Sequence, residues 1–597
     1  MKVLLFLIAF LFSTHISATS KVIVTAEKLS LDEEKTNSNV EVISESEITS
    51  SGESNLTDLI QRKSSVFVSS NGIFGKSTSL FLRGADSSYT LIVIDGIEYN
   101  DRSSVGGAAI LDHIDLSSVE KIEILKGAQS VLYGSDAMAG VIRITTKNPG
   151  EDLGSKGSLS YGSYDNKRAS FSTSQRGENL DYSMGMSFQD VEGISSYNEK
   201  RTVMAEKDGM NNLTATFKGR KKFNKTDSLE FNLRGVKAES DFDASSGDKL
   251  DYMGRDSQII AGVKYKKVLN DYWIPELSVN YSKSDRLSNS FSLSRLVAKT
   301  KKIELSNPFY INENITLLNG IEYEDIEASI ESINNKKSFN SSAAYLDTHF
   351  VYSRFSLQLG GRWTKEKIYS DRFVWKAGAG LNITNSTRLK VNYSTGFKSP
   401  SLYQLYSSFG DESLSPTKSK SYDFGIVQNV FSTELSATAF RDAYENVIDF
   451  ESTLNKYSNT FKAKTEGVEL LWKGSLESFD WSLSATLLRA VNESKGSEGT
   501  YLARRPREKY FLGTGYEFSE RVKTSLNYTY IGQRENSDFD TIVLSSYSLI
   551  DLGVNYTFSK GYDLLFKIGN LLDKDYEQVD GFGTMGRNFL LRYNFRI

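Results

Sequence analysis

Apolar and polar residues alternate with a period of two in many stretches after about Gly157. Successive side chains of a β-strand point to opposite faces, so each stretch predicts a strand with one apolar and one polar face. Clear examples are residues 182–188 (YSMGMSF), 229–233 (LEFNL), 389–393 (LKVNY) and 552–558 (LGVNYTF). Polar stretches separate the strands and are expected to be connections, among them residues 239–256, 331–342 and 493–500.

The first 18 residues differ from the rest of the chain. Lys2 is followed by an unbroken apolar run, Val3–Phe12, and then by the mostly small and polar residues 13–20. This order is typical of a secretory signal, cleaved near Ala18 or Ser20. The apolar run is too short to cross a bilayer as a helix, which needs ~18 or more residues. The sequence therefore predicts an exported protein.

Two architectures produce such amphipathic strands. A soluble sandwich or propeller buries its apolar faces, whereas a membrane β-barrel turns them to lipid and keeps a polar lumen. The signal and the even spacing of aromatic residues, which form 12% of the chain, favour the barrel. At about 20 residues per strand and connection, the chain after Gly150 predicts an all-β membrane protein with an antiparallel transmembrane barrel of about 22 strands.

The segment before Gly150 has a different pattern. Residues 90–95 (TLIVID) form a continuous apolar run, as expected of a strand buried on both faces. Asp95-Gly96 is a turn signal, and residues 119–125 and 140–146 are similar buried runs. A compact α+β domain is therefore expected here. Because so wide a barrel has an open lumen unless something fills it, we expect this domain to be a plug inside the barrel.

Composition limits the possible chemistry. The chain has no cysteine and three histidines, His15, His113 and His349. Disulfides, thiolate metal sites and thiol nucleophiles are therefore excluded, and His-ligated zinc or a Ser-His-Asp triad nearly so. The net charge of −4 gives no argument for nucleic-acid binding. Composition thus gives no support to an enzyme.

Short motifs in the first domain occur in a fixed order: residues 79–84 (SLFLRG), 91–96 (LIVIDG), 122–127 (IEILKG) and 133–142 (YGSDAMAGVI). The barrel region adds residues 396–402 (GFKSPSL), 466–469 (EGVE) and 570–576 (NLLDKDY). Together these motifs resemble the TonB-dependent outer-membrane receptors over essentially the whole mature chain. The resemblance implies a bacterial outer-membrane protein, inserted into lipid by the barrel-assembly machinery, that imports a nutrient with energy from TonB and catalyses no reaction.

The resemblance also divides the chain. It implies a signal peptide (1–18), a TonB box segment (19–30), a plug domain (31–150) and the transmembrane barrel (151–597). Within the family, the spacing from Asn71-Gly72 to Arg83-Gly84 is similar to that of cobalamin (vitamin B12) receptors. Cobalamin uptake is therefore expected, with a ferric-siderophore receptor as the alternative. A passive porin needs neither plug nor TonB box, and a soluble exported enzyme needs a nucleophile or metal motif.

Residues 22–26, Val22-Ile23-Val24-Thr25-Ala26, resemble the TonB box. A short β-prone segment near a free N-terminus can add as a strand to the edge of a partner's sheet, and pulling on it then transmits force to the plug. The polar stretch 30–39 separates this segment from the next apolar run, as a tether does. The alternative is an ordinary first strand of the plug.

Arg83 and Lys126 each follow an apolar strand of the plug. In the family, basic residues at these positions face carboxylates of the barrel wall and hold the plug, and Glu469 is the candidate partner. Lys126 stands where the family often has Arg, and Thr417 where it often has Glu. Since Lys offers a point charge instead of a bidentate fork, the resemblance implies a weaker lock. The alternative is ordinary surface charge.

Plug loops at the outer end of the barrel are the candidate substrate site. Matching the cobalamin receptors position by position implicates Ser77, Ser79, Asp86, Ser104 and Val105. Short hydroxyl side chains suit the amide groups around cobalamin. Asp86 stands where those receptors have Asn, so it loses a donor and gains a charge. The alternative is that these are simply polar loop residues.

Acidic residues gather in two early loops of the barrel region. Calcium takes six to eight oxygens from carboxylates and carbonyls, often on mobile loops. The cobalamin receptors order the matching loops with calcium, so a calcium site is a hypothesis for this chain, although no EF-hand spacing is present. The alternative is solvated loops. The acids concerned are Glu206, Asp208, Asp241, Asp243, Asp248 and Asp251.

Overall fold

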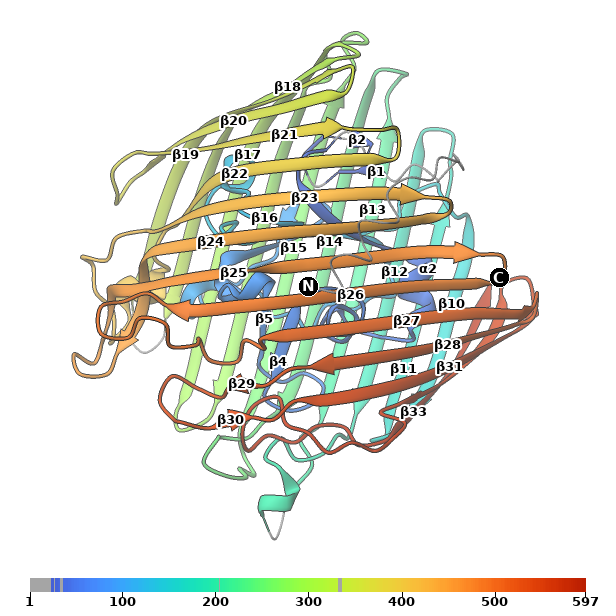
Figure 1. The fold of residues 1–597 in the computed structure, drawn as a ribbon, viewed down its shortest axis with the longest axis vertical. Helices are drawn as coiled ribbons and strands as arrows, with labels where there is room; N and C mark the ends of the chain where they lie inside the picture. Colours follow the sequence, from blue (N-terminus) through green and yellow to red (C-terminus); the bar gives the residue numbers. More distant parts are fainter. Residues whose placement is uncertain are drawn as a thin grey trace.

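The computed structural model describes residues 23–25, 27–29, 31–32, 36–202, 205–330 and 335–596. Most of these residues form a closed antiparallel barrel of 22 strands, in which β33 pairs with β10 to complete the ring (Figure 1). The predicted 22-stranded barrel is confirmed. Its strands are β10 (Gly154–Gly162), β11 (Asn166–Gln175), β12 (Leu180–Val191), β13 (Met210–Lys222), β14 (Asp227–Asp241), β15 (Met253–Lys267), β16 (Glu276–Asn289), β17 (Leu293–Asn312), β18 (Ile315–Ile330), β19 (Asn335–Tyr352), β20 (Phe355–Glu366), β21 (Arg372–Asn382), β22 (Thr387–Lys398), β23 (Thr417–Val430), β24 (Thr433–Glu451), β25 (Lys456–Leu476), β26 (Phe479–Asn492), β27 (Glu508–Ser519), β28 (Val522–Ile531), β31 (Tyr547–Ser559), β32 (Tyr562–Gly569) and β33 (Asn588–Arg596).

The barrel strands turn apolar side chains outward and polar side chains inward. On β12, Met186 is 54% exposed and Phe188 is 46% exposed, whereas the alternating Ser187 and Gln189 are buried. This arrangement is the reverse of a soluble sandwich and fits an outer surface that faces lipid. Among the described residues, no helix is long and apolar enough to cross a membrane.

The two ends of the barrel differ. Tight turns such as residues 431–432 and 477–478 lie at the end that also holds the C-terminus, whereas the opposite end carries long connections. In outer-membrane barrels the short turns are periplasmic and the long loops are extracellular. The long loops contain η5 (Glu199–Arg201), α5 (Leu402–Tyr406) and the small sheet of β29 (Arg534–Glu535) and β30 (Val543–Leu544).

Two polar stretches that we expected to be connections are partly strand. Residues 335–342 belong to β19, and the ends of the 239–256 stretch belong to β14 and β15. The predicted boundaries were wrong because long hairpins continue beyond the lipid, where both faces of a strand meet water. There the backbone ladder persists, as between Glu327 and Ser338, with few apolar residues to mark it.

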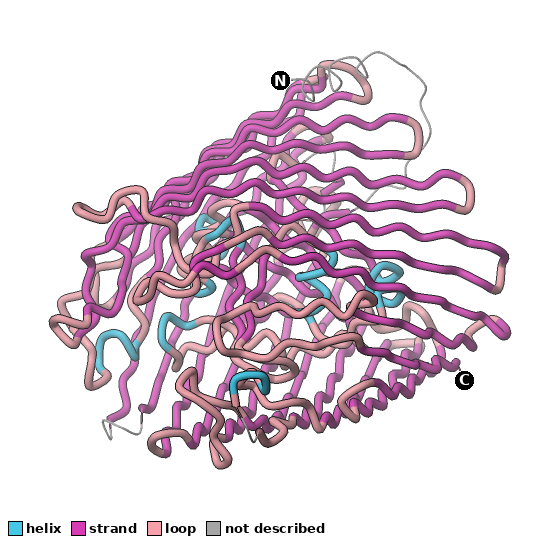
Figure 2. Tube along the Cα trace, turned by 60° about the horizontal axis from the view of Figure 1, so that its bottom comes forward, coloured by secondary structure: helices cyan, strands magenta, loops and turns pink. Residues whose placement is uncertain are grey.

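The plug lies within the barrel (Figure 2). Its five-stranded sheet has the order β3-β8-β9-β6-β7, in which β6 and β9 are parallel and the other pairs are antiparallel. The apolar runs expected to be buried strands are β6, β8 and β9, and their isoleucines form the plug core. The strands are β3 (Asn39–Ser44), β6 (Thr90–Ile94), β7 (Ile97–Glu98), β8 (Val119–Lys126) and β9 (Gly140–Thr146).

Short elements surround this sheet. The helices are α2 (Glu45–Ser51), α3 (Leu56–Lys63) and α4 (Ser130–Tyr133). Ser44 and Glu47 form a capping box that begins α2 directly after β3, because each side chain accepts the other residue's backbone N–H. Two further sheets pair β4 (Phe67–Ser70) with β5 (Thr78–Phe81) and β1 (Ile23–Val24) with β2 (Leu31–Asp32). Strand β3 is therefore an edge strand, bonded to the sheet through β8 alone.

Candidate functional site

The described part of the segment that the sequence predicts to be the TonB box is docked against the plug. Ile23 and Val24 pair with residues 31–32. The backbone N–H of Thr25 donates to Glu123 Oε1 over 2.7 Å, and its hydroxyl donates to Glu123 Oε2 over 2.8 Å. Arg143 Nη1 donates to the Thr25 carbonyl over 2.6 Å. Val22 and Ala26, like the expected signal peptide, lie outside the described residues.

An ion pair joins the end of this segment to the barrel wall. Lys28 Nζ lies 2.5 Å from Glu304 Oε1 on β17, and the Tyr345 hydroxyl of β19 donates to the same oxygen over 2.6 Å. The ammonium also lies over the rings of Tyr133 and Tyr345, 5.2 and 5.1 Å from their centroids. Residues near the N-terminus are thus fastened to both the plug and the barrel.

Arg83 and Lys126 meet carboxylates of the barrel in a buried cluster, which we call the lock. Arg83 lies 2.6 Å from Asp423 of β23 and 3.1 Å from Glu469 of β25. Lys126 lies 3.2 Å from Glu469 and 3.0 Å from Glu41 of β3. Sequence interpretation named Arg83, Lys126 and Glu469, which the structure brings together, but missed Asp423 and Glu41.

The lock cations remain charged although they are buried. Burial by itself lowers the pKa of Lys126, but the carboxylates of Glu469 and Glu41 outweigh that effect, so its pKa is raised. The pKa of Arg83 is raised in the same way, by Asp423 and then Glu469 acting against burial. The plug is therefore held at this point by ionised pairs in a poorly hydrated setting, where removal of one partner is costly.

The five candidate substrate residues lie on three neighbouring plug segments. Ser79 is on β5, and the backbone N–H of the next residue, Leu80, donates to the Ser87 hydroxyl. A Cβ added at Gly106 would lie 3.1 Å from Ser88. These contacts connect the segments around residues 77–79, 86–88 and 104–107. Ser77, Asp86 and Val105 are exposed, whereas Ser79 and Ser104 are half-buried.

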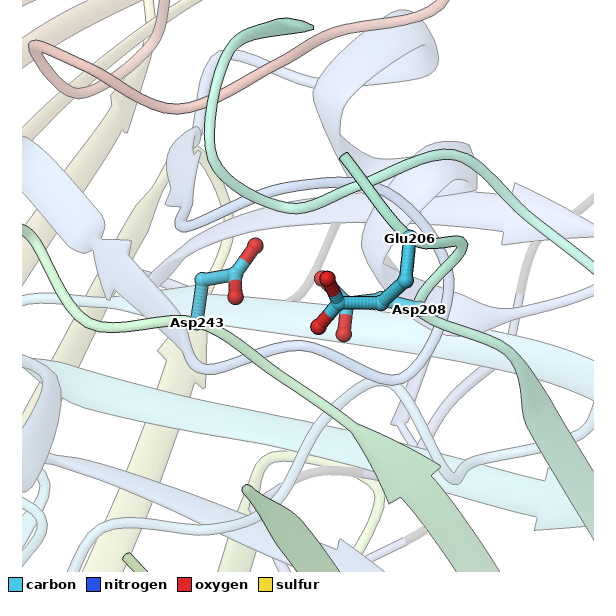
Figure 3. A group of neighbouring side chains, drawn as sticks. All are labelled: Glu206, Asp208 and Asp243. Carbon is cyan, nitrogen blue, oxygen red and sulfur yellow. The ribbon is translucent and has the colours of Figure 1, made fainter. Parts of the chain in front are cut away.

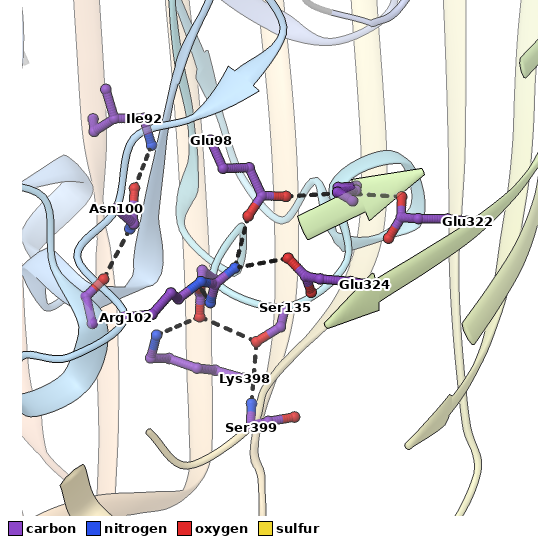
Figure 4. A network of polar contacts seen from close by, with 12 residues as sticks. Ile92, Glu98, Asn100, Arg102, Ser135, Glu322, Glu324, Lys398 and Ser399 are labelled. Atoms are coloured by element: carbon purple, nitrogen blue, oxygen red, sulfur yellow. Dashed lines mark hydrogen bonds and ion pairs between the residues drawn. The ribbon is translucent and has the colours of Figure 1, made fainter. Parts of the chain in front are cut away.

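Two basic residues next to these segments are already engaged by the protein. Lys76 is buried, and its Nζ donates to the carbonyls of Asp208 and Gly209 over 3.0 and 3.2 Å. Arg102 lies between Glu98, 2.7 Å away, and Glu324 of β18, 3.7 Å away (Figure 4). It also pairs with Asp136, which accepts a hydrogen bond from Lys398 of β22.

Arg505, from the loop between β26 and β27, is a residue of this region that sequence interpretation missed. Its Nε donates to the Gly84 carbonyl over 3.1 Å, and its guanidinium lies 4.3 Å from the centroid of the Phe81 ring. It approaches Asp86 to 3.8 Å. The sequence signal was the run Arg504-Arg505-Pro506-Arg507, but nothing in it indicates which arginine reaches the plug.

Three of the acidic loop residues converge. Oxygens of Glu206, Asp208 and Asp243 lie within 4.8 Å of one another (Figure 3). Asp248 is adjacent, because the Ser195 hydroxyl bonds to Asp243 and Asp248 over 3.0 and 3.1 Å. Asp241 and Asp251 are not members of this group. Three of the six acids that the sequence suggested thus form one compact group, because loop acids close in sequence separate once the strands fix their positions.

The converging carboxylates repel one another. Burial, with the neighbouring Asp248 and Asp243, raises the pKa of Glu206 to about 7. Burial and Asp243 likewise raise the pKa of Asp208 to about 6, against hydrogen bonds from Ser196. Both oxygens of Glu206 and Oδ1 of Asp208 are buried without a hydrogen-bond partner. The chemistry of this donor set fits a hard cation such as calcium.

The fold and its buried ion pairs define a plugged outer-membrane barrel. Residues 32–141 match the family model of the TonB-dependent receptor plug domain, and residues 133–571 match that of the TonB-dependent receptor-like β-barrel. The chain belongs to the TonB-dependent receptors. It is accordingly a protein of the bacterial outer membrane, in a family of transporters and receptors that take energy from TonB and are not enzymes.

Similar proteins fall into two groups. The chain is 26% identical over 603 residues to the vitamin B12 transporter BtuB of Vibrio cholerae serotype O1, and 27% identical over 618 residues to that of Vibrio vulnificus, each covering 99% of this chain and 97% of the relative. Among solved structures, the ferric-catecholate import receptor Fiu of E. coli K12 has a TM-score of 0.79 at 18% identity, covering 97% of this chain and all of that one. The siderophore receptor PirA of Acinetobacter baumannii has a TM-score of 0.82 at 16% identity, covering 96% and 100%. These structural matches show the shared fold.

Proposed function

We propose that this receptor imports cobalamin. The full-length similarity to vitamin B12 transporters supports this substrate. The main support from the structure is that the cations beside the plug apex are already paired within the protein. The plug apex means the segments 77–79, 86–88 and 104–107. Cobalamin carries many neutral amide groups, so a site for it needs hydroxyls and backbone groups more than fixed charge.

The cations beside the apex are poorly placed to bind an anionic ferric chelate, which is the alternative substrate. Lys76 is 3% exposed and bonds to backbone carbonyls. Arg102 is paired with three carboxylates, and Arg505 with a carbonyl, a ring and Asp86. Asp86 itself is an exposed carboxylate, with 54% of its side chain accessible, and would repel an anion. These contacts favour a neutral ligand.

Calorimetry on the purified receptor tests the substrate directly. We expect saturable binding of cobalamin, weakened at least several-fold by Ser104→Leu, because overfilling a close contact costs ~1–3 kcal/mol and tenfold corresponds to about 1.4 kcal/mol. Ser46→Leu, on the exposed face of α2, is the matched control and should bind normally. Absence of binding by the unmodified receptor, together with tight binding of a ferric chelate, would refute cobalamin as the substrate.

We also propose that Glu206, Asp208 and Asp243 bind calcium and so order the loops above the plug. Support comes from their convergence and from the buried, partnerless oxygens of Glu206 and Asp208. Lys76 connects this group to the apex, because it donates to the backbone carbonyl of Asp208, which is one of the three acids, and to that of the next residue, Gly209. Calcium would therefore also stabilise the apex segment that follows Lys76.

Asp243→Asn should lower the affinity for calcium by about tenfold or more, since loss of one charged ligand worth ~1.4 kcal/mol has that effect. Asp251→Asn, in the same loop but outside the group, should change it less than about twofold, as expected of a solvated carboxylate. Calcium titration by calorimetry measures both. Equal affinities for the two variants, or no calcium binding by the parent, would favour solvated acidic loops.

A further inference from the structure

A cavity of about 260 Å³ lies inside the barrel, between the plug and the strands β33, β10 and β11. On the plug side its lining includes residues of α2 and residues 116–119. On the barrel side the lining includes Gly561, from the tight turn between β31 and β32, and Arg596, at the end of β33. Both lie at the end of the barrel with the short turns, so we call this space the periplasmic cavity.

The barrel wall of the periplasmic cavity is built from rows of lumen-facing residues on three adjacent strands. Arg592, Ser160 and Arg168 form one row across β33, β10 and β11, and Asn594, Ser158 and Ser170 form the next row toward the periplasm. The first row thus carries two arginines on either side of a serine. The second row has short polar side chains, which leave space beside the arginines.

Cations outnumber carboxylates in the lining, and the carboxylates are already engaged. Glu45 pairs with Lys147 over 3.3 Å, and Glu53 pairs with Lys567 of β32. Asp563 accepts a hydrogen bond over 2.8 Å from the asparagine of the short row. These carboxylates are therefore committed to other partners than the two arginines.

Arg592 and Arg168 keep unused donors in this space. Both are 7% exposed, and the Nε atom of each is buried without a hydrogen-bond partner in the described part of the chain. Arg168 pairs with Asp115 of the plug. Among the described residues Arg592 forms no ion pair, and its Nη2 donates to the carbonyls of Gly52 and Glu53 over 2.9 and 3.5 Å.

Two buried arginines in one row call for an anion between them. Arginine does not lose its proton in proteins, so neither side chain can become neutral, and an unpaired buried charge is costly. Adjacent strands are about 4.8 Å apart, which places the Cα atoms of Arg168 and Arg592 roughly 10 Å from each other. A small anion above Ser160 can therefore reach both guanidinium groups, whose planar sets of N–H donors match the oxygens of a phosphate.

We propose that the periplasmic cavity binds a free tetrahedral oxyanion of the phosphate class, held by Arg168 and Arg592. The cavity is smaller than the ~300–1,000 Å³ of a site for a drug-sized ligand, which favours an inorganic ion over a larger organic phosphate. Arg592 also holds the backbone that follows α2, and Arg168 holds Asp115. The bound ion therefore stabilises the plug on this side of the barrel, whichever substrate the receptor imports.

Calorimetric titration of the purified receptor with inorganic phosphate tests the site. Chloride keeps the ionic strength constant, and the buffer is free of calcium so that calcium phosphate does not form. We expect saturable binding that Arg592→Gln weakens by about tenfold or more, because charge-assisted hydrogen bonds are lost. Arg521→Gln removes the same charge from an exposed position in the turn between β27 and β28, and should change the affinity less than about twofold. No saturable binding by the parent, or equal affinities of the two variants, would overturn the site.

A second pair of variants keeps both arginines and changes the space beside them. Ser158, whose Oγ lies 2.8 Å from that of Ser170, belongs to the short row. Ser158→Asp places a fixed carboxylate next to the expected ion and should abolish phosphate binding, whereas the similarly sized, neutral Ser158→Asn should keep most of it. Phosphate should also slow hydrogen exchange in α2 of the parent by about twofold or more, but not in α2 of Ser158→Asp. If the Asp and Asn variants bind phosphate equally well, the ion does not occupy this cavity.

Discussion

Replacing Val24 by proline is expected to reduce uptake to background while leaving ligand binding unchanged. Proline has no backbone N–H, so it removes a donor from the strand that the TonB box segment would add to the edge of a partner's sheet. In the resting structure this segment is docked, with Thr25 bonded to Glu123 and Arg143. If residues 22–26 are the TonB box, energy coupling requires both release of these contacts and a strand that can pair again. Uptake of labelled ligand by cells and binding to isolated outer membranes measure the two steps separately.

A matched variant distinguishes loss of the partner strand from loss of the small sheet within the plug. Val24 pairs with Leu31 between β1 and β2. Leu31→Pro disrupts the same two-residue pairing, which is marginal by itself, but leaves residues 22–26 intact. We expect this variant to retain most of its uptake. Normal uptake by the Val24→Pro receptor would show that residues 22–26 do not couple energy through an added strand.

The barrel was predictable because the same alternation of lipid-facing and lumen-facing residues repeats in its strands. Each lipid-facing residue, such as Met186 or Phe188, stands beside a lumen-facing polar residue, and this alternation is visible in the sequence. Prediction failed at residues 335–342, where β19 leaves the lipid and polar residues occupy both faces. There the strand continues mainly through its backbone ladder, and a backbone ladder has no composition signal. The plug strands were visible because burial on both faces, as in β6, requires a continuous apolar run.

The site was less predictable because it depends on residues from distant strands. Motifs indicated Arg83, Lys126 and Glu469, but Asp423 is two strands from Glu469 and lies in no motif. Its only signal was a charge at a lumen-facing position of β23, among the buried Ser419 and Ser421. The acidic loops show the same limitation. Position in the sequence grouped the acids, but which of them converge is decided by how far β13, β14 and β15 extend.

Arg83→Gln is expected to loosen the plug strongly, because it leaves Asp423 and Glu469 buried without their shared cation. Removing one partner of a buried ion pair typically costs about 3–5 kcal/mol, which corresponds to roughly 150- to 4,000-fold in an opening equilibrium. The change should appear as faster hydrogen exchange in β3 and β8. Lys126, at the end of β8, is then the one cation of the lock that still pairs with Glu469. It should also increase the entry of bulky antibiotics into cells that carry the variant.

Arg489→Gln is the matched control for the lock. Arg489 pairs over 2.9 Å with Glu466 of β25, which is three residues from Glu469. Both members of this pair are partly exposed, with 47% of the Arg489 side chain and 32% of the Glu466 side chain accessible. Solvent screens such a pair, so its loss should cost only about 0–1 kcal/mol. Arg83→Lys should fall between the two, because it keeps the charge but cannot reach Asp423 and Glu469 with a rigid fork. If Arg83→Gln exchanges no faster than Arg489→Gln, the ion pairs do not hold the plug, and its seating in the barrel must come from the remaining contacts along the wall.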